Sequence, residues 1–222
     1  MRRLLKTFIL VVLISTVASS VAPSQAFAEF ASDYPGVSPA IGPAANPGLT
    51  HGEQALNFGA LYVAQWAFYL VQQNKTIIEQ GSFQHMRDNW YRPHFDNDSF
   101  EYNIFKHSLT GMSYYQFYRS RGYGVERAFL WTFASSLVFE FTIETLTERP
   151  SFQDIYQTPV YGVILGFGFE KISQACHSTD TFLGHACGYL FDPFTLIPAT
   201  PKFAILPDFK NHSYVASATW EF

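Results

Sequence analysis

Residues 133–146 read FASSLVFEFTIETL, and they set the character of the whole chain. Apolar residues fill this stretch, yet Ser136, Glu140 and Glu144 recur every four residues and therefore share one face of a helix. An ionised carboxylate in such surroundings needs a partner, or its pKa rises and it takes up a proton. We expect an apolar helix over about residues 125–147 that packs a polar stripe against its neighbours.

Matching polar residues occur on the segments before and after this helix. His107 lies four residues from both Asn103 and Gly111 on a helix expected over about residues 100–120, and Asp154 and Thr158 are again four apart on the following helix. If these helices pack as consecutive hairpins, their polar faces converge on one site. We expect the core of this site to comprise His107, Glu140, Glu144 and Asp154, with a supporting network of Asn103, Arg119, Ser136 and Thr158.

Two interpretations of this site stay open. In one, His107 is a general base or metal ligand that works with the carboxylates on a lipid-like substrate, as a hydrolase or transferase. In the other, the same residues form a closed polar network that fixes how the helices pack. The sequence contains no nucleophile elbow, His-Glu-x-x-His motif, P-loop or dinucleotide fingerprint, so it identifies no reaction, metal or cofactor.

The organisation expected along the chain is mainly α. We predict a bundle of four or five apolar, aromatic-rich helices over residues 51–200, preceded by an extended Pro/Gly/Ala-rich arm over residues 29–50. The last ten residues alternate in a strand period, so residues 201–222 are expected to form a short C-terminal β-strand or hairpin.

The aromatic content is high, with 23 Phe, 13 Tyr and 4 Trp against only 14% charged residues. Such a chain either buries an aromatic core or keeps apolar surface in contact with lipid, and composition alone does not separate the two. No uncharged stretch clearly reaches the length of a membrane span, because Glu140 and Glu170 each end an apolar run.

The first 28 residues predict export. A basic start precedes the uncharged apolar run Phe8–Ile14, and Ala26-Phe27-Ala28 then matches the small-x-small sequence that signal peptidase requires. We expect cleavage before Glu29; the alternative, a retained N-terminal anchor, is disfavoured because the apolar run is short for a bilayer. Cleavage leaves 11 basic against 18 acidic residues, a formal charge of −7 that argues against nucleic acid as a partner.

The two cysteines, Cys176 and Cys187, lie in the segment CHSTDTFLGHAC. An exported chain favours a disulfide across this short loop. Two free thiols, and a metal site that includes His177 and His185, are the other readings, although the spacing matches no common structural zinc pattern.

Several spaced motifs together resemble one known family. They are Phe95-Asp96-x-Asp98-Ser99, Asn103-x-x-x-His107-x-x-x-Gly111, Ser136-x-x-x-Glu140-x-x-x-Glu144, Asp154-x-x-x-Thr158 and Asp192-Pro193. Over about residues 90–195 the chain resembles the bacterial envelope family catalogued as domain of unknown function 3943. The resemblance implies an exported, envelope-associated helical domain and carries no established activity.

These observations lead to one expectation about function and one alternative. We expect an exported protein of the periplasm or outer membrane of a Gram-negative-type bacterium, with a structural or interaction role and membrane lipid or an envelope protein as partner. The alternative is the lipid-directed hydrolase or transferase built on His107.

Overall fold

The protein is described by a computed structural model that covers residues 49–97, 99–197, 202–208 and 213–219; of residues 102, 103 and the two strands, only the backbone is described. The expected signal peptide and residues 29–48 of the expected arm lie outside this part of the chain. The mainly α architecture predicted from the sequence is confirmed.

Five long helices match the five segments in which the sequence predicts them. They are α3 (His51–Gln72), α6 (Phe100–Ser120), α7 (Val125–Val138), α8 (Phe152–His177) and α9 (Phe182–Phe191). Two short helices, α4 (Asn74–Gln80) and α5 (Phe83–Asn89), bring the number in the described residues to seven, beside the four or five bundle helices that the sequence predicts. The start of α5 is local in origin, because the Ser82 side chain accepts a hydrogen bond from the backbone N–H of His85 and so caps the helix.

Side-chain caps also fix where the longer helices begin. Thr50 and Glu53 form a reciprocal capping box at the start of α3. Ser151 caps α8 by accepting from the backbone N–H of Asp154, which places Asp154 in the first turn. Pro159 lies inside α8 but does not end it.

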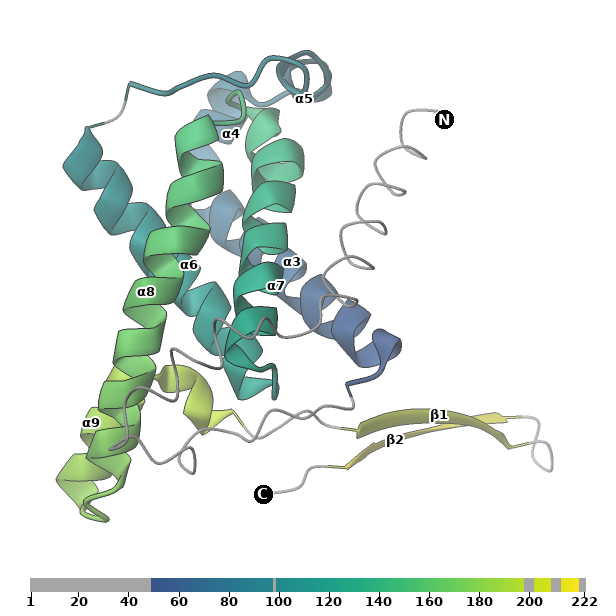
Figure 1. The fold of residues 1–222 in the computed structure, drawn as a ribbon. Coiled ribbons are helices and arrows are strands. Elements are labelled where there is room, and N and C mark those ends of the chain that lie inside the picture. Colours follow the sequence, from purple (N-terminus) through teal and green to yellow (C-terminus); the bar gives the residue numbers. More distant parts are fainter. Residues whose placement is uncertain (1–48, 98, 198–201, 209–212, 220–222) are drawn as a thin grey trace.

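The tightest packing in the bundle is between α6 and α8, which cross with α7 alongside (Figure 1). The backbones touch where Gly111 meets Gly162: a Cβ on Gly111 would overlap the carbonyl oxygen of Thr158 and lie 3.0 Å from the Gly162 Cα. Glycine is required here because any side chain would hold the helices apart. The crossing fixes the register that brings His107, one turn before Gly111, against Thr158.

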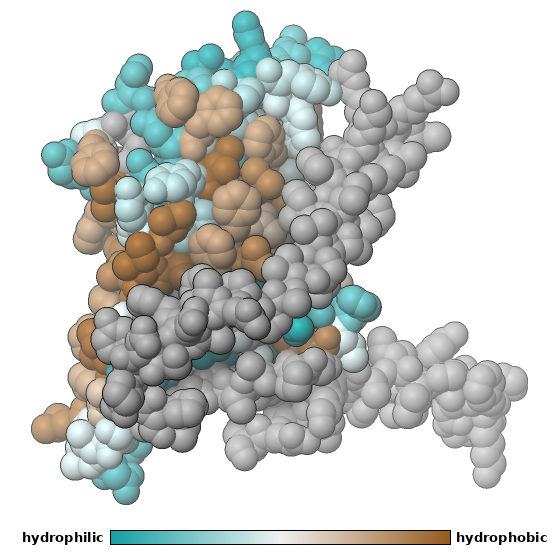
Figure 2. Space-filling view, viewed as in Figure 1, coloured by the Kyte–Doolittle hydropathy of each residue, from teal (hydrophilic) through white to brown (hydrophobic). Residues whose placement is uncertain are grey.

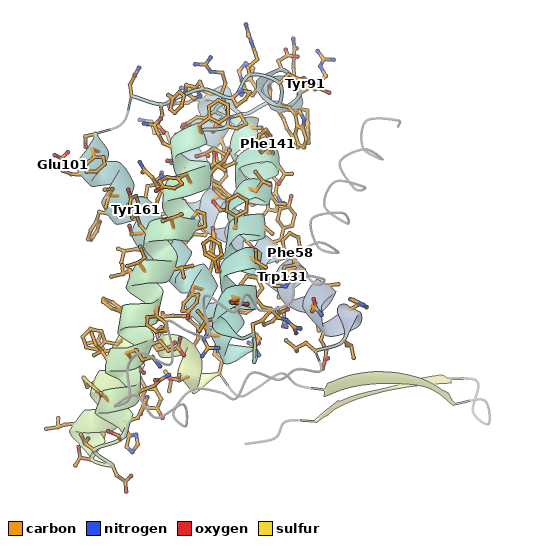
Figure 3. The ribbon with its side chains drawn as sticks, in the orientation of Figure 1. Phe58, Tyr91, Glu101, Trp131, Phe141 and Tyr161 are labelled. Carbon is orange, nitrogen blue, oxygen red and sulfur yellow. A yellow bond between two sulfur atoms is a disulfide. The ribbon has the colours of Figure 1, made fainter. Side chains whose placement is uncertain are left out.

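An aromatic cluster fills the space between α3, α6 and α7. Tyr118, Tyr123 and Trp131 are buried, with ring centroids 5.1–6.1 Å apart. Phe58 of α3 joins them, its ring 5.7 Å from that of Trp131 (Figure 3). This cluster is where the aromatic-rich helices bury their rings.

The burial of the bundle is otherwise unusual. In the described part of the chain, 20 buried side chains are polar or charged and 13 are hydrophobic, while many large apolar side chains point outward. No helix among the described residues combines the length and apolarity needed to cross a membrane.

The chain ends in an antiparallel pair, β1 (Lys202–Asp208) and β2 (Ser213–Thr219), with Lys202 opposite Thr219 and Asp208 opposite Ser213 (Figure 1). Strand β2 lies in the segment whose sequence alternates in a strand period.

Candidate functional site

The predicted carboxylates lie where α7 changes its helical pitch. After Val138 the chain forms a π-helical turn, η1 (Phe139–Ile143), and then a 3₁₀ turn, η2 (Glu144–Leu146). The backbone N–H of Phe139 is shared between the carbonyls of Ser135 and Ser136 at this transition. Single π turns inside α-helices are frequent at functional sites, and this one carries Glu140 and Glu144 into the bundle.

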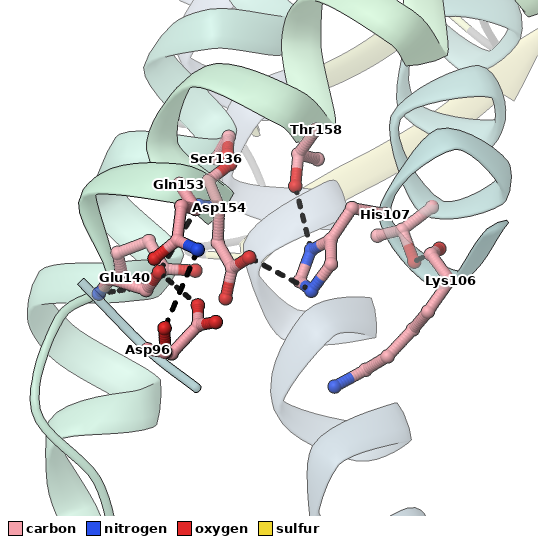
Figure 4. A network of polar contacts seen from close by, with 10 residues as sticks. Asp96, Lys106, His107, Ser136, Glu140, Gln153, Asp154 and Thr158 are labelled. Atoms are coloured by element: carbon pink, nitrogen blue, oxygen red, sulfur yellow. Dashed lines mark hydrogen bonds and ion pairs between the residues drawn. The ribbon is translucent and has the colours of Figure 1, made fainter. Parts of the chain in front are cut away.

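His107 of α6 is held at both ring nitrogens by α8. Its Nδ1 lies 2.9 Å from the Thr158 hydroxyl, and its Nε2 lies 3.2 Å from Asp154 Oδ1 (Figure 4). Burial, and then the charge of Lys106, lowers the pKa of His107 to about 4, so the ring is neutral at neutral pH. The neutral ring accepts from the Thr158 hydroxyl at Nδ1, and its Nε2 contacts the Asp154 carboxylate.

Glu140 and Glu144 form a hydrogen-bonded pair of carboxyl groups. Burial, followed by the charge of Glu144, raises the pKa of Glu140 well above its usual range, and burial also raises the pKa of Glu144. Glu140 therefore carries the proton and donates it to Glu144. Glu140 Oε2 in turn accepts the backbone N–H of Ser151 at 3.0 Å, which ties the pair to the start of α8.

Two further hydrogen bonds extend this site, and one of them reaches the loop before α6. The Ser151 hydroxyl donates to the Asp96 carboxylate, and the Ser136 hydroxyl reaches the carbonyl of Asp154 at 3.5 Å. Figure 4 shows the Asp154 carboxylate between Glu140 and His107. The structure thus brings together His107, Glu140, Glu144, Asp154, Ser136 and Thr158, as the sequence predicts, and adds Asp96. In the sequence, Asp96 stood only within the motif Phe95-Asp96-x-Asp98-Ser99, which gave no sign of a contact 55 positions away.

Carboxylate oxygens from Glu140, Glu144 and Asp154 all lie within 4.8 Å of one another. Oxygen donors this close can hold a divalent cation. His107 touches Asp154 and supports it from the far side.

Residues 92–194 match the family model described as "Domain of unknown function (DUF3943)". This part of the chain is a DUF3943 domain. The resemblance seen in the sequence is thereby confirmed, and the domain contains every predicted site residue. No curated protein and no solved structure matches the chain.

Arg119, which the sequence placed in the network supporting His107 and the three carboxylates, belongs instead to a second network of the DUF3943 domain. Its guanidinium grips Glu170 of α8, with Nη2 2.6 Å from Oε1 and Nε 3.0 Å from Oε2. The hydroxyl of Tyr115 donates to the same carboxylate at 3.0 Å. Arg119 and Glu170 are 51 positions apart in the sequence. Only the charge of Glu170 at the end of an apolar run indicated that this residue would need a partner.

A small cavity of about 120 Å³ adjoins this second network. It is lined by Arg119, Ser120, Glu170, Ser173, Gln174, His177, Asp192 and Thr195. Sites for small organic ligands usually occupy about 300–1,000 Å³, so this space suits a few water molecules.

The remaining predicted residues are placed as follows. Asn103 lies on α6, one turn before His107, but its side chain is outside the described part of the chain. Cys176 and Cys187 form a disulfide, with their Cα atoms 5.8 Å apart. The bridge is reachable because α8 ends at His177 and the chain turns back into α9, so the two cysteines do not lie on one continuous helix.

Proposed function

We propose that this chain is an exported protein of the Gram-negative-type cell envelope, and that its helical domain acts at the outer membrane in a structural or interaction role, with lipid against its apolar outer surface. The observation that carries the proposal is the inverted distribution of side chains, polar inside and apolar outside. The leader-like sequence of residues 1–28 supports export.

Helix α8 gives the clearest case of this inversion. Its inner face buries Asp154, Thr158 and Glu170, whereas Ile164 on its outer face is 67% exposed. A helix at the surface of a water-soluble domain has the opposite arrangement. Ionisable residues that face the interior of a bundle and pair with one another, behind an apolar outer surface, are typical of helices in contact with lipid.

The apolar surface also has a definite place on the molecule. In Figure 2, brown side chains gather over the middle of the bundle, and teal residues gather at the end formed by α4 and α5. Further outward-pointing apolar residues lie on the other helices, among them Val63, Phe68, Phe105, Phe182 and Leu190. An apolar belt of this kind matches contact with the membrane, because it exceeds the scattered apolar residues of an ordinary protein surface.

The buried network serves this role by fixing how the helices pack. His107, Asp154 and Thr158 connect α6 to α8, and Glu140 connects η1 to the start of α8 through Ser151. With lipid outside, the helices gain little from burying apolar faces against each other, so close packing and internal hydrogen bonds hold them together.

The test is to express the full-length chain in a Gram-negative host, sequence the N-terminus of the mature protein, and separate the outer membrane from the periplasm. We expect an N-terminus at Glu29 and an outer-membrane protein that detergent releases and 1 M salt does not. Changing both Ile164 and Leu190 to Gln should shift protein into the soluble fraction, whereas Glu79→Gln, at an exposed position on α4, should not. A wild-type protein found wholly in the soluble periplasm would refute the membrane role.

One observation favours a second candidate, the lipid-directed hydrolase or transferase. Thr158, His107 and Asp154 form a hydroxyl–imidazole–carboxylate chain in which the hydroxyl could attack an ester carbonyl while its proton passes to His107 Nδ1 and then to the departing alcohol. The chain is closed, with His107 6% and Thr158 3% exposed, so substrate entry requires α6 and α8 to separate. Ester hydrolysis on mixed lipid micelles that Thr158→Val abolishes and Thr158→Ser retains would establish this function. Absence of ester hydrolysis by the purified protein would refute this second function.

A further inference from the structure

The carboxylate cluster has a geometry that hydrogen bonds alone leave incomplete. Glu140, Glu144 and Asp154 come from three successive elements, η1, η2 and α8, and each offers an oxygen within 4.8 Å of the other two. Two oxygens bound to one ion at about 2.1–2.4 Å lie at most about 4.8 Å apart. The cluster therefore has the size of a single coordination sphere.

A second observation points to a ligand at this place. The Glu144 side chain is only 8% exposed, and, apart from the Glu140 carboxyl group, its buried Oε2 has no hydrogen-bond partner among the described residues. When Glu140 is ionised, this oxygen has lost water and gained no donor, which is strongly unfavourable. A cation between the three carboxylates would provide the missing partner.

Two basic side chains of α6 bear on this site. Arg119 pairs with Glu170 on another part of α8, and Lys106, beside His107, has an exposed side chain whose charge acts on Glu144. His107 is neutral and lies against Asp154 through Nε2, the contact that commonly orients a carboxylate ligand from behind.

We propose that Glu140, Glu144 and Asp154 together bind one divalent cation that prefers oxygen ligands, and Mn²⁺ is the ion used to test it. Three carboxylates are a hard, oxygen-only donor set, which suits Mg²⁺, Ca²⁺ and Mn²⁺. Mn²⁺ accepts such oxygen ligands, and its paramagnetism makes binding directly measurable. Binding replaces the proton shared by Glu140 and Glu144, which leaves to solvent as the ion enters.

This inference does not depend on the proposed membrane role, because the cluster lies inside the domain whatever covers its outer surface. The two ideas can fail separately: one is tested by where the protein partitions, the other by what it binds. A cation at this point would also fasten η1 and η2 to α8, so its binding should stabilise the fold.

The experiment uses the mature chain in mild detergent, stripped with EDTA and titrated with Mn²⁺ while the electron paramagnetic resonance signal of the free ion is followed. We expect one Mn²⁺ per chain and a raised unfolding temperature. Glu144→Gln should weaken binding at least about tenfold, as loss of a ligand does. The matched control is Glu148→Gln, because Glu148 is exposed and only four residues away; it should bind like the wild type.

Two results would overturn the proposal: a folded wild-type chain that binds no Mn²⁺, or a Glu144→Gln variant that binds it as tightly as the wild type. If Glu144→Gln does not fold, Asp154→Asn takes its place with the same expected loss. If neither folds, the wild-type titration decides, since one equivalent bound with a raised unfolding temperature supports the site and no binding refutes it.

Discussion

Replacing Gly111 by alanine is the sharpest perturbation of the α6–α8 crossing. The new Cβ would overlap the carbonyl oxygen of Thr158, and it would lie 2.8 Å from the carbonyl carbon and 3.0 Å from the Gly162 Cα. All three atoms belong to backbone, so no side-chain rotation can relieve the clash. Ordinary carbon–carbon contacts lie at about 3.5–4.0 Å, and the helices must therefore separate by about 1 Å.

This displacement lowers the free energy of unfolding. Overpacking a tight contact destabilises a fold by about 1–3 kcal/mol. A separation of about 1 Å would also stretch the 2.9 Å bond between His107 and Thr158 beyond hydrogen-bonding range, which removes about 1 kcal/mol. Because alanine has a higher helix propensity than glycine, the substitution also stabilises α6 by up to about 1 kcal/mol. The net loss expected for Gly111→Ala is about 1–3 kcal/mol.

Gly168 on α8 is the matched control, because a Cβ built there meets nothing within 4 Å. Gly168→Ala should stabilise the protein by up to about 1 kcal/mol. Denaturant unfolding followed by circular dichroism gives both values in one buffer. Equal stabilities for the two variants would refute the account of the crossing, since helix propensity would then be the only effect at both positions.

Three further predictions concern the polar groups and the disulfide. His107→Gln should lower the free energy of unfolding by about 1–3 kcal/mol, since Thr158 loses its hydrogen bond and Asp154 its buried neighbour; a change below about 0.5 kcal/mol in urea unfolding would contradict this. Burial, offset in part by the Phe194 N–H, raises the pKa of Asp192 to about 6, so the folded state favours the protonated carboxyl group. The stabilisation of the fold by this proton is present at pH 4 and is lost as pH rises through 6. Unfolding curves between pH 4 and 7 should show the wild type losing up to about 3 kcal/mol relative to Asp192→Asn, and parallel pH profiles would speak against the shift. Cys176→Ser should lower stability by about 3 kcal/mol, the loop-closure value for a bridge across 11 positions, and a reductant should then have no effect on the variant.

Local patterns were sufficient to predict much of the fold. The spacing of Asn103, His107 and Gly111 predicted one face of α6, and in the structure the Ser151 hydroxyl caps the start of α8. Glu140 and Glu144 were expected to be buried because charges within an apolar run must face a polar partner, and both are buried.

Other features depend on contacts that no local pattern contains. Arg119 could have paired with any carboxylate of the bundle, and its choice of Glu170 follows from the α6–α8 register set at Gly111 and Gly162. The π turn at Phe139–Ile143 was missed because a four-residue spacing reads as an ordinary α-helix. Composition left open whether the apolar residues face inward or outward, since an aromatic core and an apolar outer surface use the same residue types.

Flotation of the purified mature chain with phospholipid vesicles tests whether the outer apolar surface of the helical domain contacts lipid. Vesicles of phosphatidylethanolamine and phosphatidylglycerol should carry the chain upward in a density gradient. The association should persist in 1 M salt, because apolar contact, unlike electrostatic attraction, is not screened. A chain that stays at the bottom of the gradient as a monodisperse, detergent-free protein would contradict the claim.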